Sequence, residues 1–177
     1  MRFAAVVAEL AAPPRPVVLV DGRSGAGKST LAARLVAAWP GPVTLVSLDD
    51  LFPGWDGLAA GSDAVARDVL RRTEPGYTRW DWHRRRPGGW VDLASDGPLV
   101  VEGCGALTPA NRALATAGIW VELPDAARRE RALARDGATF APHWDRWAAQ
   151  EDTHLAAHHP TALADWWYRP GHGFARR

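Results

Sequence analysis

The sequence predicts an α/β domain in which a parallel sheet is covered by helices on both faces. The apolar run at residues 17–20 precedes a glycine-rich stretch, a segment with apolar residues at helical spacing, and a second apolar run at 43–48. This order is typical of a βαβ unit, whose parallel strands require a right-handed crossover. Further strand-like and helix-like segments alternate along the chain, which favours a three-layer arrangement.

Length and composition indicate one domain, residues 1–177, with 47% hydrophobic and 23% charged residues. The formal net charge of +1 provides no overall field to attract a nucleic acid or an anionic membrane, so we expect neither as a partner. A single cysteine cannot form an internal disulfide, and we find no leader and no apolar run of about 18 residues. We therefore expect a cytoplasmic protein, and the oligomeric state stays open.

The remaining elements follow from caps and breakers. Outside the first βαβ unit, the expected helices are 3–12, 62–72, 109 onward, 125–136 and 144–157, and the expected strands are 99–101 and 119–123. Ser62 or Asp63 is a candidate cap of its helix, Thr108 precedes a first-position proline, and Gly137 breaks the helix before it. We interpret residues 73–93 as a loop, whereas 162–169 suit either a strand or a short helix.

The stretch from Gly22 to Ser29 matches the phosphate-binding pattern G-x-x-x-x-G-K-[ST], with a strand before it and a helix after it. Glycines let the backbone N–H groups fold around a phosphate, and the helix adds the positive end of its dipole. The motif predicts that Lys28 reaches the β and γ oxygens of ATP and that the Ser29 hydroxyl binds Mg²⁺. The expected ATP-binding residues are Gly22, Arg23, Ser24, Gly25, Ala26, Gly27, Lys28, Ser29 and Thr30.

Lys28 is the only lysine in the chain, while all other basic residues, out of 21 in total, are arginines. An ammonium on a flexible stem differs from a planar guanidinium in shape and hydration. This usage indicates that position 28 requires an ammonium.

The rest of the sequence narrows the class of nucleotide-binding protein. A GTPase of the common kind needs an Asn-Lys-x-Asp guanine reader, but Asn111 is the only asparagine and the loop holds the only lysine. Transport, motor and ring-forming ATPases need longer chains. A small-molecule kinase that uses ATP and Mg²⁺ remains, and its partner is a small-molecule acceptor.

Three carboxylates follow predicted strands. Asp49, Asp50 and Glu102 lie where the carboxyl ends of parallel strands place ligands. One can accept the proton of an attacking hydroxyl while another holds Mg²⁺. We favour Asp49 and Glu102 for these functions, and Asp50 is as consistent with capping a turn.

Together these segments resemble the uridine kinase and phosphoribulokinase group of nucleoside-kinase-like proteins. The resemblance rests on Asp21-Gly-x-Ser-Gly-x-Gly-Lys-Ser-Thr, Ser47-Leu-Asp-Asp-Leu-Phe52, Val101-Glu-Gly103 and an arginine-rich helix ending in Arg135-Asp136. It implies a P-loop NTPase fold, Asp49 as the general base and Glu102 as a magnesium ligand. The family's acceptor segment, Asn-Phe-Asp-His-Pro, has Arg79-Trp80-Asp81-Trp82-His83 as its counterpart here, which leaves the acceptor open.

An aromatic and basic segment at 73–93 is the expected acceptor site. Its rings and carboxylate suit a hydroxylated acceptor that carries a ring. The expected acceptor-binding residues are Trp55, Tyr77, Arg79, Asp81, Trp82 and His83. Tryptophans that cover a sheet edge beside solvated arginines explain the same segment equally well.

A small helical lid is expected at 125–157. Arg128, Arg131 and Arg135 recur at spacings of three and four, so they share one helix face. We expect Arg131 and Arg135 to contact the transferring phosphoryl group, although surface ion pairs are an alternative, above all for Arg128. His154 and His158 have helical spacing, but no third zinc ligand supports them.

The sequence therefore predicts an ATP- and Mg²⁺-dependent kinase with Lys28, Asp49, Arg131 and Arg135 as catalytic residues and Ser29, Glu102 and Asp49 around the metal. A nucleoside is the first choice of acceptor. The alternatives are a kinase for another hydroxylated metabolite, such as a sugar acid, vitamin precursor or antibiotic, and a regulatory protein that binds ATP without turnover.

Overall fold

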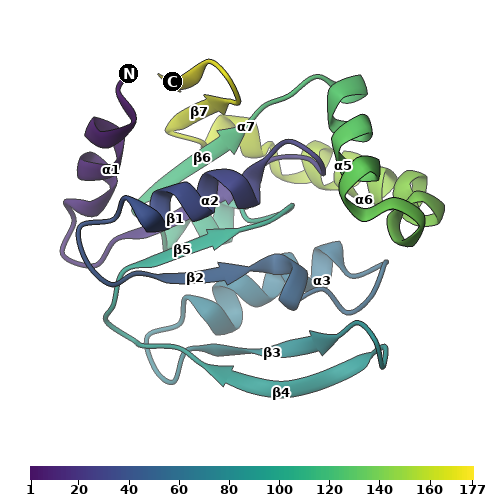
Figure 1. Cartoon of the computed structure of the whole chain (residues 1–177). Helices are drawn as coiled ribbons and strands as arrows, with labels where there is room; N and C mark the ends of the chain where they lie inside the picture. The colour runs from purple at the N-terminus through teal and green to yellow at the C-terminus, as the bar shows by residue number, and fades with distance from the viewer.

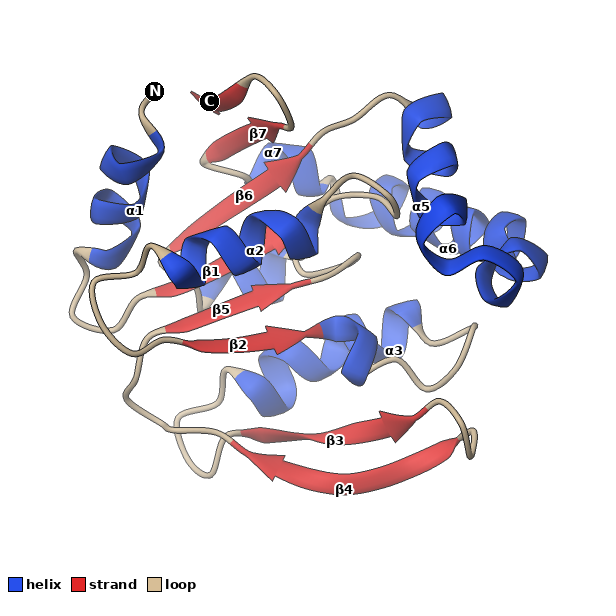
Figure 2. Cartoon of the chain, viewed as in Figure 1, coloured by secondary structure: helices blue, strands red, loops and turns tan.

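The central layer is a six-stranded sheet with the strand order β2-β5-β1-β6-β7-β8 (Figures 1 and 2). The computed structural model describes all residues from Met1 to Arg177. The strands are β1 (Val17–Asp21), β2 (Thr44–Ser47), β5 (Leu99–Glu102), β6 (Ala117–Val121), β7 (Trp166–Arg169) and β8 (Gly173–Arg176). All neighbours pair in parallel except β7 and β8, which are antiparallel. The predicted parallel sheet is confirmed.

Helices cover both faces of this sheet, as the sequence predicts. In Figure 1, α1 (Phe3–Ala11) and α2 (Lys28–Ala37) lie in front, and α3 (Leu58–Ala64) and α7 (Pro160–Leu163) lie behind. Two longer helices, α5 (Asp125–Phe140) and α6 (Trp144–His158), stand beyond the ends of the strands. The short elements are η1 (Leu48–Asp50), the π-helical η2 (Val65–Val69), α4 (Pro109–Ala113) and η3 (Ala141–His143). No helix has both the length and the apolar character needed to span a bilayer.

The buried side chains of β1 alternate between two apolar clusters. Val17 and Leu19 belong to the cluster that includes Phe52 and Leu58, whereas Val18 and Val20 belong to the cluster of α1 and α2. Successive strand residues point to opposite faces, so a strand covered on both sides is apolar at every position. This is the physical reason for the continuous apolar run in the sequence.

Residues 73–93 are not a loop, and this expectation was wrong. β3 (Gly76–Asp81) and β4 (Arg86–Asp92) form a separate antiparallel two-stranded sheet. Six of the seven residues of β4 are exposed, so β4 carries no apolar alternation, and Pro87, Gly88 and Gly89 have low strand propensity. Pairing with β3, rather than burial, defines this strand.

The ends of the other helices agree with the sequence-based expectations in part. α3 begins at Leu58, so neither Ser62 nor Asp63 caps it, and the Ser62 hydroxyl instead donates to the Gly105 carbonyl at 2.7 Å. The cap at Thr108 is confirmed, because its side chain accepts from the Asn111 N–H. α5 has non-helical angles at Gly137, where we expected a break. The open choice at 162–169 is resolved, since α7 ends at Leu163 and β7 follows.

Asp21, the last residue of β1, is a buried carboxylate that joins two loops. Its Oδ1 accepts from the N–H groups of Gly22 at 2.6 Å and Gly105 at 3.0 Å, and its Oδ2 accepts from Leu107 at 2.8 Å. Burial raises its pKa to about 6, against these bonds and the Lys28 charge. Asp21 therefore fixes the start of the glycine-rich loop to the segment after β5.

The raised pKa predicts a pH-dependent contribution to stability. Between the ordinary value of 3.8 and about 6 the folded state holds more protons at Asp21 than the unfolded state, so stability falls as pH rises through this window. We expect the unfolding free energy of the wild type relative to Asp21→Asn to decrease by roughly 3 kcal/mol over that window. Urea denaturation at several pH values measures it, with Asp96→Asn as an exposed control. A constant difference contradicts the prediction.

Candidate functional site

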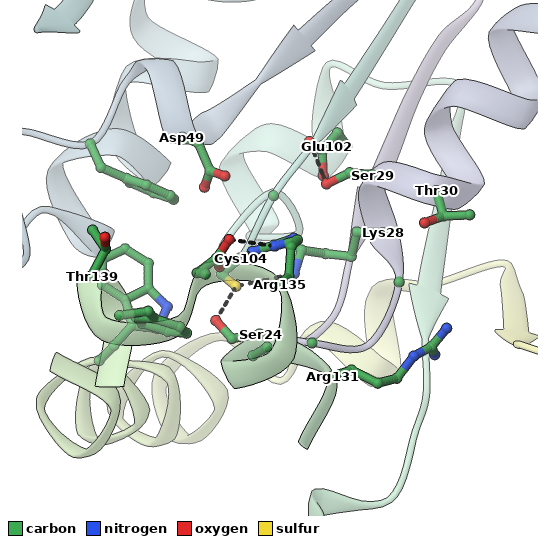
Figure 3. A pocket seen from close by; sticks show the side chains of 18 of the residues that line it. Ser24, Lys28, Ser29, Thr30, Asp49, Glu102, Cys104, Arg131, Arg135 and Thr139 are labelled. Atoms are coloured by element: carbon green, nitrogen blue, oxygen red, sulfur yellow. Dashed lines mark hydrogen bonds and ion pairs between the residues drawn. The ribbon is translucent and has the colours of Figure 1, made fainter. Parts of the chain in front are cut away.

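A cavity of about 710 Å³ lies at the carboxyl ends of the strands, between the glycine-rich loop and the helices α5 and α6. Figure 3 shows Lys28 and Ser29 on one side of it and Thr139 on the other. The cavity is lined by Ser24, Gly25, Gly27, Lys28, Ser29, Thr30, Asp49, Phe52, Trp55, Trp82, Glu102, Gly103, Cys104, Arg131, Ala132, Arg135, Asp136, Thr139, Phe140 and Trp147.

The loop between β1 and α2 has the backbone shape that its glycines predict. Gly25 and Gly27 have φ angles of +78° and +102°, in the region that favours glycine. The Ala26 N–H closes a turn onto the Arg23 carbonyl at 3.1 Å. No acceptor in the chain takes the backbone N–H of Gly25, Gly27, Lys28, Ser29 or Thr30. These donors are available to an anion at the start of α2.

Lys28 is buried at the floor of the cavity. Its Nζ lies 3.2 Å from the Arg23 carbonyl oxygen and 3.2 Å from the Cys104 sulfur. Burial alone would lower the pKa of this ammonium, but the nearby carboxylates, above all Glu102 and Glu151, raise it. The side chain is therefore positively charged at any physiological pH.

Ser29 and Glu102 form an oxygen-rich pair beside Lys28. The Ser29 hydroxyl donates to both carboxylate oxygens of Glu102 at 3.1 and 3.2 Å, and Ser47 donates to Oε1 at 2.8 Å. Burial raises the pKa of Glu102, while Lys28 opposes the rise. A hydroxyl and a carboxylate beside a phosphate site are hard oxygen ligands of the kind Mg²⁺ takes, so these residues fit that ion.

Of the two adjacent aspartates, Asp49 lines the cavity and Asp50 does not. The Asp49 side chain is exposed to the cavity. The protein groups around its carboxyl raise its pKa by partial desolvation, against the charges of Lys28 and Arg135. The Trp82 indole N–H donates to the backbone carbonyl of Asp49 at 2.8 Å. Asp50 instead accepts from Arg79 at 3.0 Å.

The three arginines of α5 have different surroundings. Arg131 and Arg135 line the cavity, and Arg135 also pairs with Asp136 at 2.8 and 2.6 Å. Arg128 is buried and donates to the carbonyl of Ser24 at 3.0 Å. The shared helix face thus brings all three near the glycine-rich loop, although Arg128 alone contacts its backbone.

The wall opposite Lys28 is aromatic. The rings of Trp55 and Trp82 lie 5.0 Å apart, Trp55 stacks with Phe140 at 5.6 Å, and Phe52 meets Trp147 edge-on at 4.9 Å. Only Trp55 and Trp82 were among the predicted acceptor residues. Phe52 follows η1, whereas Phe140 and Trp147 come from α5 and α6. The aromatic residues at 140–147 are the sequence signal that could have identified the last two.

Four predicted acceptor residues do not line the cavity: Tyr77, Arg79, Asp81 and His83. Tyr77 is a buried residue of β3, and Arg79 donates to the Asp50 carboxylate. Asp81, the last residue of β3, accepts the N–H and the guanidinium of Arg84 at 2.9 and 3.1 Å.

Three predicted ATP-binding residues also lie outside the cavity lining. Gly22 packs so closely against the Val121 carbonyl that a side chain at this position would collide with it. Ala26 is fully buried. The Arg23 side chain points to α6, where it pairs with Glu151 at 3.0 Å and Asp152 at 2.7 Å. The side chains of Arg23 and Ala26 therefore support the loop.

The other titratable groups near the loop form no metal site of their own. The rings of His154 and His158 are 4.7 Å apart, and burial, followed by His158, lowers the pKa of His154 to about 4. The structure holds no group of three or more His, Cys, Asp or Glu side chains arranged around a metal ion. Burial raises the pKa of Cys104 to about 12, so it is a buried thiol.

Solved structures share this fold across nearly the whole chain. A possible uridine kinase from Bacillus stearothermophilus is similar with a TM-score of 0.65 and 17% identity, covering 93% of this chain and 94% of the other. A candidate fructose transport system kinase from Silicibacter sp. TM1040 has a TM-score of 0.56 and 21% identity, with coverages of 93% and 92%. A gluconokinase from Sinorhizobium meliloti 1021 has a TM-score of 0.46 and 21% identity over 81% of this chain and 74% of its own. No family model and no curated protein matches the sequence. The chain therefore has the fold of the P-loop kinases, as its sequence motifs predict.

Proposed function

We propose that this protein is an ATP- and Mg²⁺-dependent kinase that transfers the γ-phosphoryl group to a hydroxyl of a small molecule. The supporting observation is the contact of Ser29 with Glu102, at 3.1 and 3.2 Å, within a cavity that Asp49 also lines. The contact brings a metal-binding hydroxyl and carboxylate to the start of α2, beside the free N–H groups of the loop. A glycine-rich turn without a nucleotide has no need of this arrangement.

Each part of the cavity has a chemical task in this proposal. The loop N–H groups and the Lys28 ammonium bind the β- and γ-phosphates, and Arg131 and Arg135 add positive charge from the lid. Ser29 and Glu102 would hold Mg²⁺, and Asp49, which lines the same cavity, is a further candidate ligand. The ion would neutralise phosphate charge. Asp49 accepts the proton of the attacking hydroxyl, for which its raised pKa is suited.

We propose a ring-bearing alcohol as the acceptor, with a nucleoside as the first choice. The aromatic wall of Phe52, Trp55, Trp82 and Trp147 can stack on a flat ring. In this proposal the segment 125–157 is the lid of the site. The first structure compared is named as a uridine kinase, which agrees with this choice. The second is named as a fructose transport system kinase, so another hydroxylated metabolite is the alternative.

The Lys28 ammonium is expected to be essential. Lys28→Ala should weaken ATP binding and abolish phosphoryl transfer, because no other lysine can reach the β and γ charges. Lys28→Arg should also fail, since a planar guanidinium is larger than the ammonium that lies 3.2 Å from both the Arg23 carbonyl oxygen and the Cys104 sulfur. Titration of a fluorescent ATP analogue and a turnover assay measure both effects. Near-normal turnover of the arginine variant would refute the requirement for an ammonium.

Asp49→Asn should lower kcat by on the order of 10² or more while ATP affinity changes only a few fold. Asp50→Asn is the matched control, because Asp50 pairs with Arg79 outside the cavity. Since the pKa of Asp49 is raised, kcat/KM of the wild type should increase with pH over a range above the ordinary aspartate pKa, as the base loses its proton. Reversed effects of the two variants would show that Asp50 is the base.

A coupled assay of ADP release over nucleosides, sugars, sugar acids and vitamin precursors identifies the acceptor. We expect ring-bearing compounds with a primary hydroxyl to stimulate release, and 2′- or 3′-deoxy compounds to be poorer if the ribose is read by hydrogen bonds. Trp82→Ala should raise the acceptor KM by about tenfold or more, on the order of one stacking contact. Asp81→Ala should change the acceptor KM little, because Asp81 lies outside the cavity lining and pairs with Arg84. If all nucleosides are inert and another alcohol reacts, the nucleoside assignment falls.

A further inference from the structure

Both lid helices contact the backbone of the same loop residue, Ser24. From α5, Arg128 Nη1 donates to the Ser24 carbonyl at 3.0 Å, and from α6, Glu151 Oε1 accepts from the Ser24 N–H at 2.7 Å. Figure 1 shows the two helices beside the loop that joins β1 to α2. The peptide groups on either side of the Ser24 Cα are thus held by two separate helices.

The two side chains involved are charged, yet each is only 4% exposed. Glu151 also binds the Arg23 guanidinium at 3.0 Å and the Cys104 sulfur at 3.2 Å. Arg128 also pairs with Asp125. Burying a charge is costly unless it is paired and hydrogen-bonded, so these contacts hold the loop and the lid in one relative position.

The backbone position of Ser24 constrains the loop residues that come after it. Gly25 has φ +78°, and a Cβ on it would collide with the backbone carbonyl of Arg128. The loop backbone is therefore pressed directly against the start of α5. Because the free N–H groups begin at Gly25, the orientation of the Ser24 carbonyl sets the direction of the first of them.

From these contacts we propose that Arg128 and Glu151 are positioning residues that hold the phosphate loop in its nucleotide-binding shape. The inference rests on the proposed function, since it requires that the loop binds a nucleotide. Glu151 lies one helical turn after Trp147, which lines the aromatic wall of the same cavity. Helix α6 therefore links the acceptor side of the site to the phosphate side.

Substitutions at Glu151 test the role of α6. Glu151→Ala removes the acceptor for the Ser24 N–H and should weaken binding of a fluorescent ADP analogue by about tenfold or more, the effect of one lost charge-assisted hydrogen bond. Glu151→Gln keeps an acceptor and should recover most of that affinity. Asp152→Asn is the matched control, because Asp152 also pairs with Arg23 but is 65% exposed, and it should bind as the wild type does.

Substitutions at Arg128 test the role of α5 with the same probe. Arg128→Ala should weaken binding by a similar factor, Arg128→Lys should recover part of it, and Arg129→Ala is the exposed control. Because both residues act on Ser24, the double alanine variant should bind only slightly more weakly than either single one. Where turnover is measured, KM for ATP should change more than kcat, which a general loss of folded protein would not produce.

The possible results separate the two proposals. Thermal unfolding of each variant shows that binding is measured on folded protein, and the Gln and Lys variants remain informative if an alanine variant does not fold. If the wild type binds the analogue and Glu151→Ala and Arg128→Ala bind it equally well, the positioning role is overturned while the proposed function stands. Additive losses in the double variant, or no recovery in the Gln and Lys variants, also overturn it. If the wild type binds no nucleotide, both proposals fall.

Discussion

The structure depends on a short run of backbone N–H groups, most of which have no acceptor in the chain. Between Gly25 and Thr30, only Ala26 directs its N–H to a protein acceptor. Backbone N–H groups without an acceptor in the chain contribute no hydrogen bond to the stability of the fold. The loop that carries them therefore has to be held in place by neighbouring residues. That support comes from Asp21 at the start of the loop, from Arg128 and Glu151 at Ser24, and from α2 at its end.

Charge balance around Lys28 follows from the same requirement. The ammonium is buried with Glu102, Asp49 and Glu151 nearby, and in return Lys28 opposes the rise in pKa that burial imposes on Glu102 and Asp49. Opposite charges in a low-dielectric site stabilise one another and remain available to a charged ligand. The cavity thus holds a balanced set of charges on its phosphate side and an aromatic surface on its other side.

The aromatic wall of the cavity is assembled from segments far apart in the chain. Phe52 and Trp55 follow η1, Trp82 follows β3, Phe140 belongs to α5 and Trp147 belongs to α6. The Trp82 indole bonds to the backbone of Asp49, so the hairpin also orients the candidate base. Contacts of this kind connect the acceptor wall to the chemistry at the phosphate side.

The sequence by itself determined the parts whose signal is local. The apolar runs defined β1, β2, β5 and β6, the glycines defined the loop, and the cap at Thr108 and the break at Gly137 defined helix ends, because each depends on backbone preferences within a few residues. The positions of Asp49 and Glu102 directly after apolar runs also predicted that both lie at the carboxyl ends of strands. Only the tertiary structure decided that β4 is a strand, that Asp81 pairs with Arg84 outside the cavity, and that Glu151 reaches the loop. Pairing partners, side-chain direction and burial against distant residues carry no local signature, so they are set only when the chain has folded.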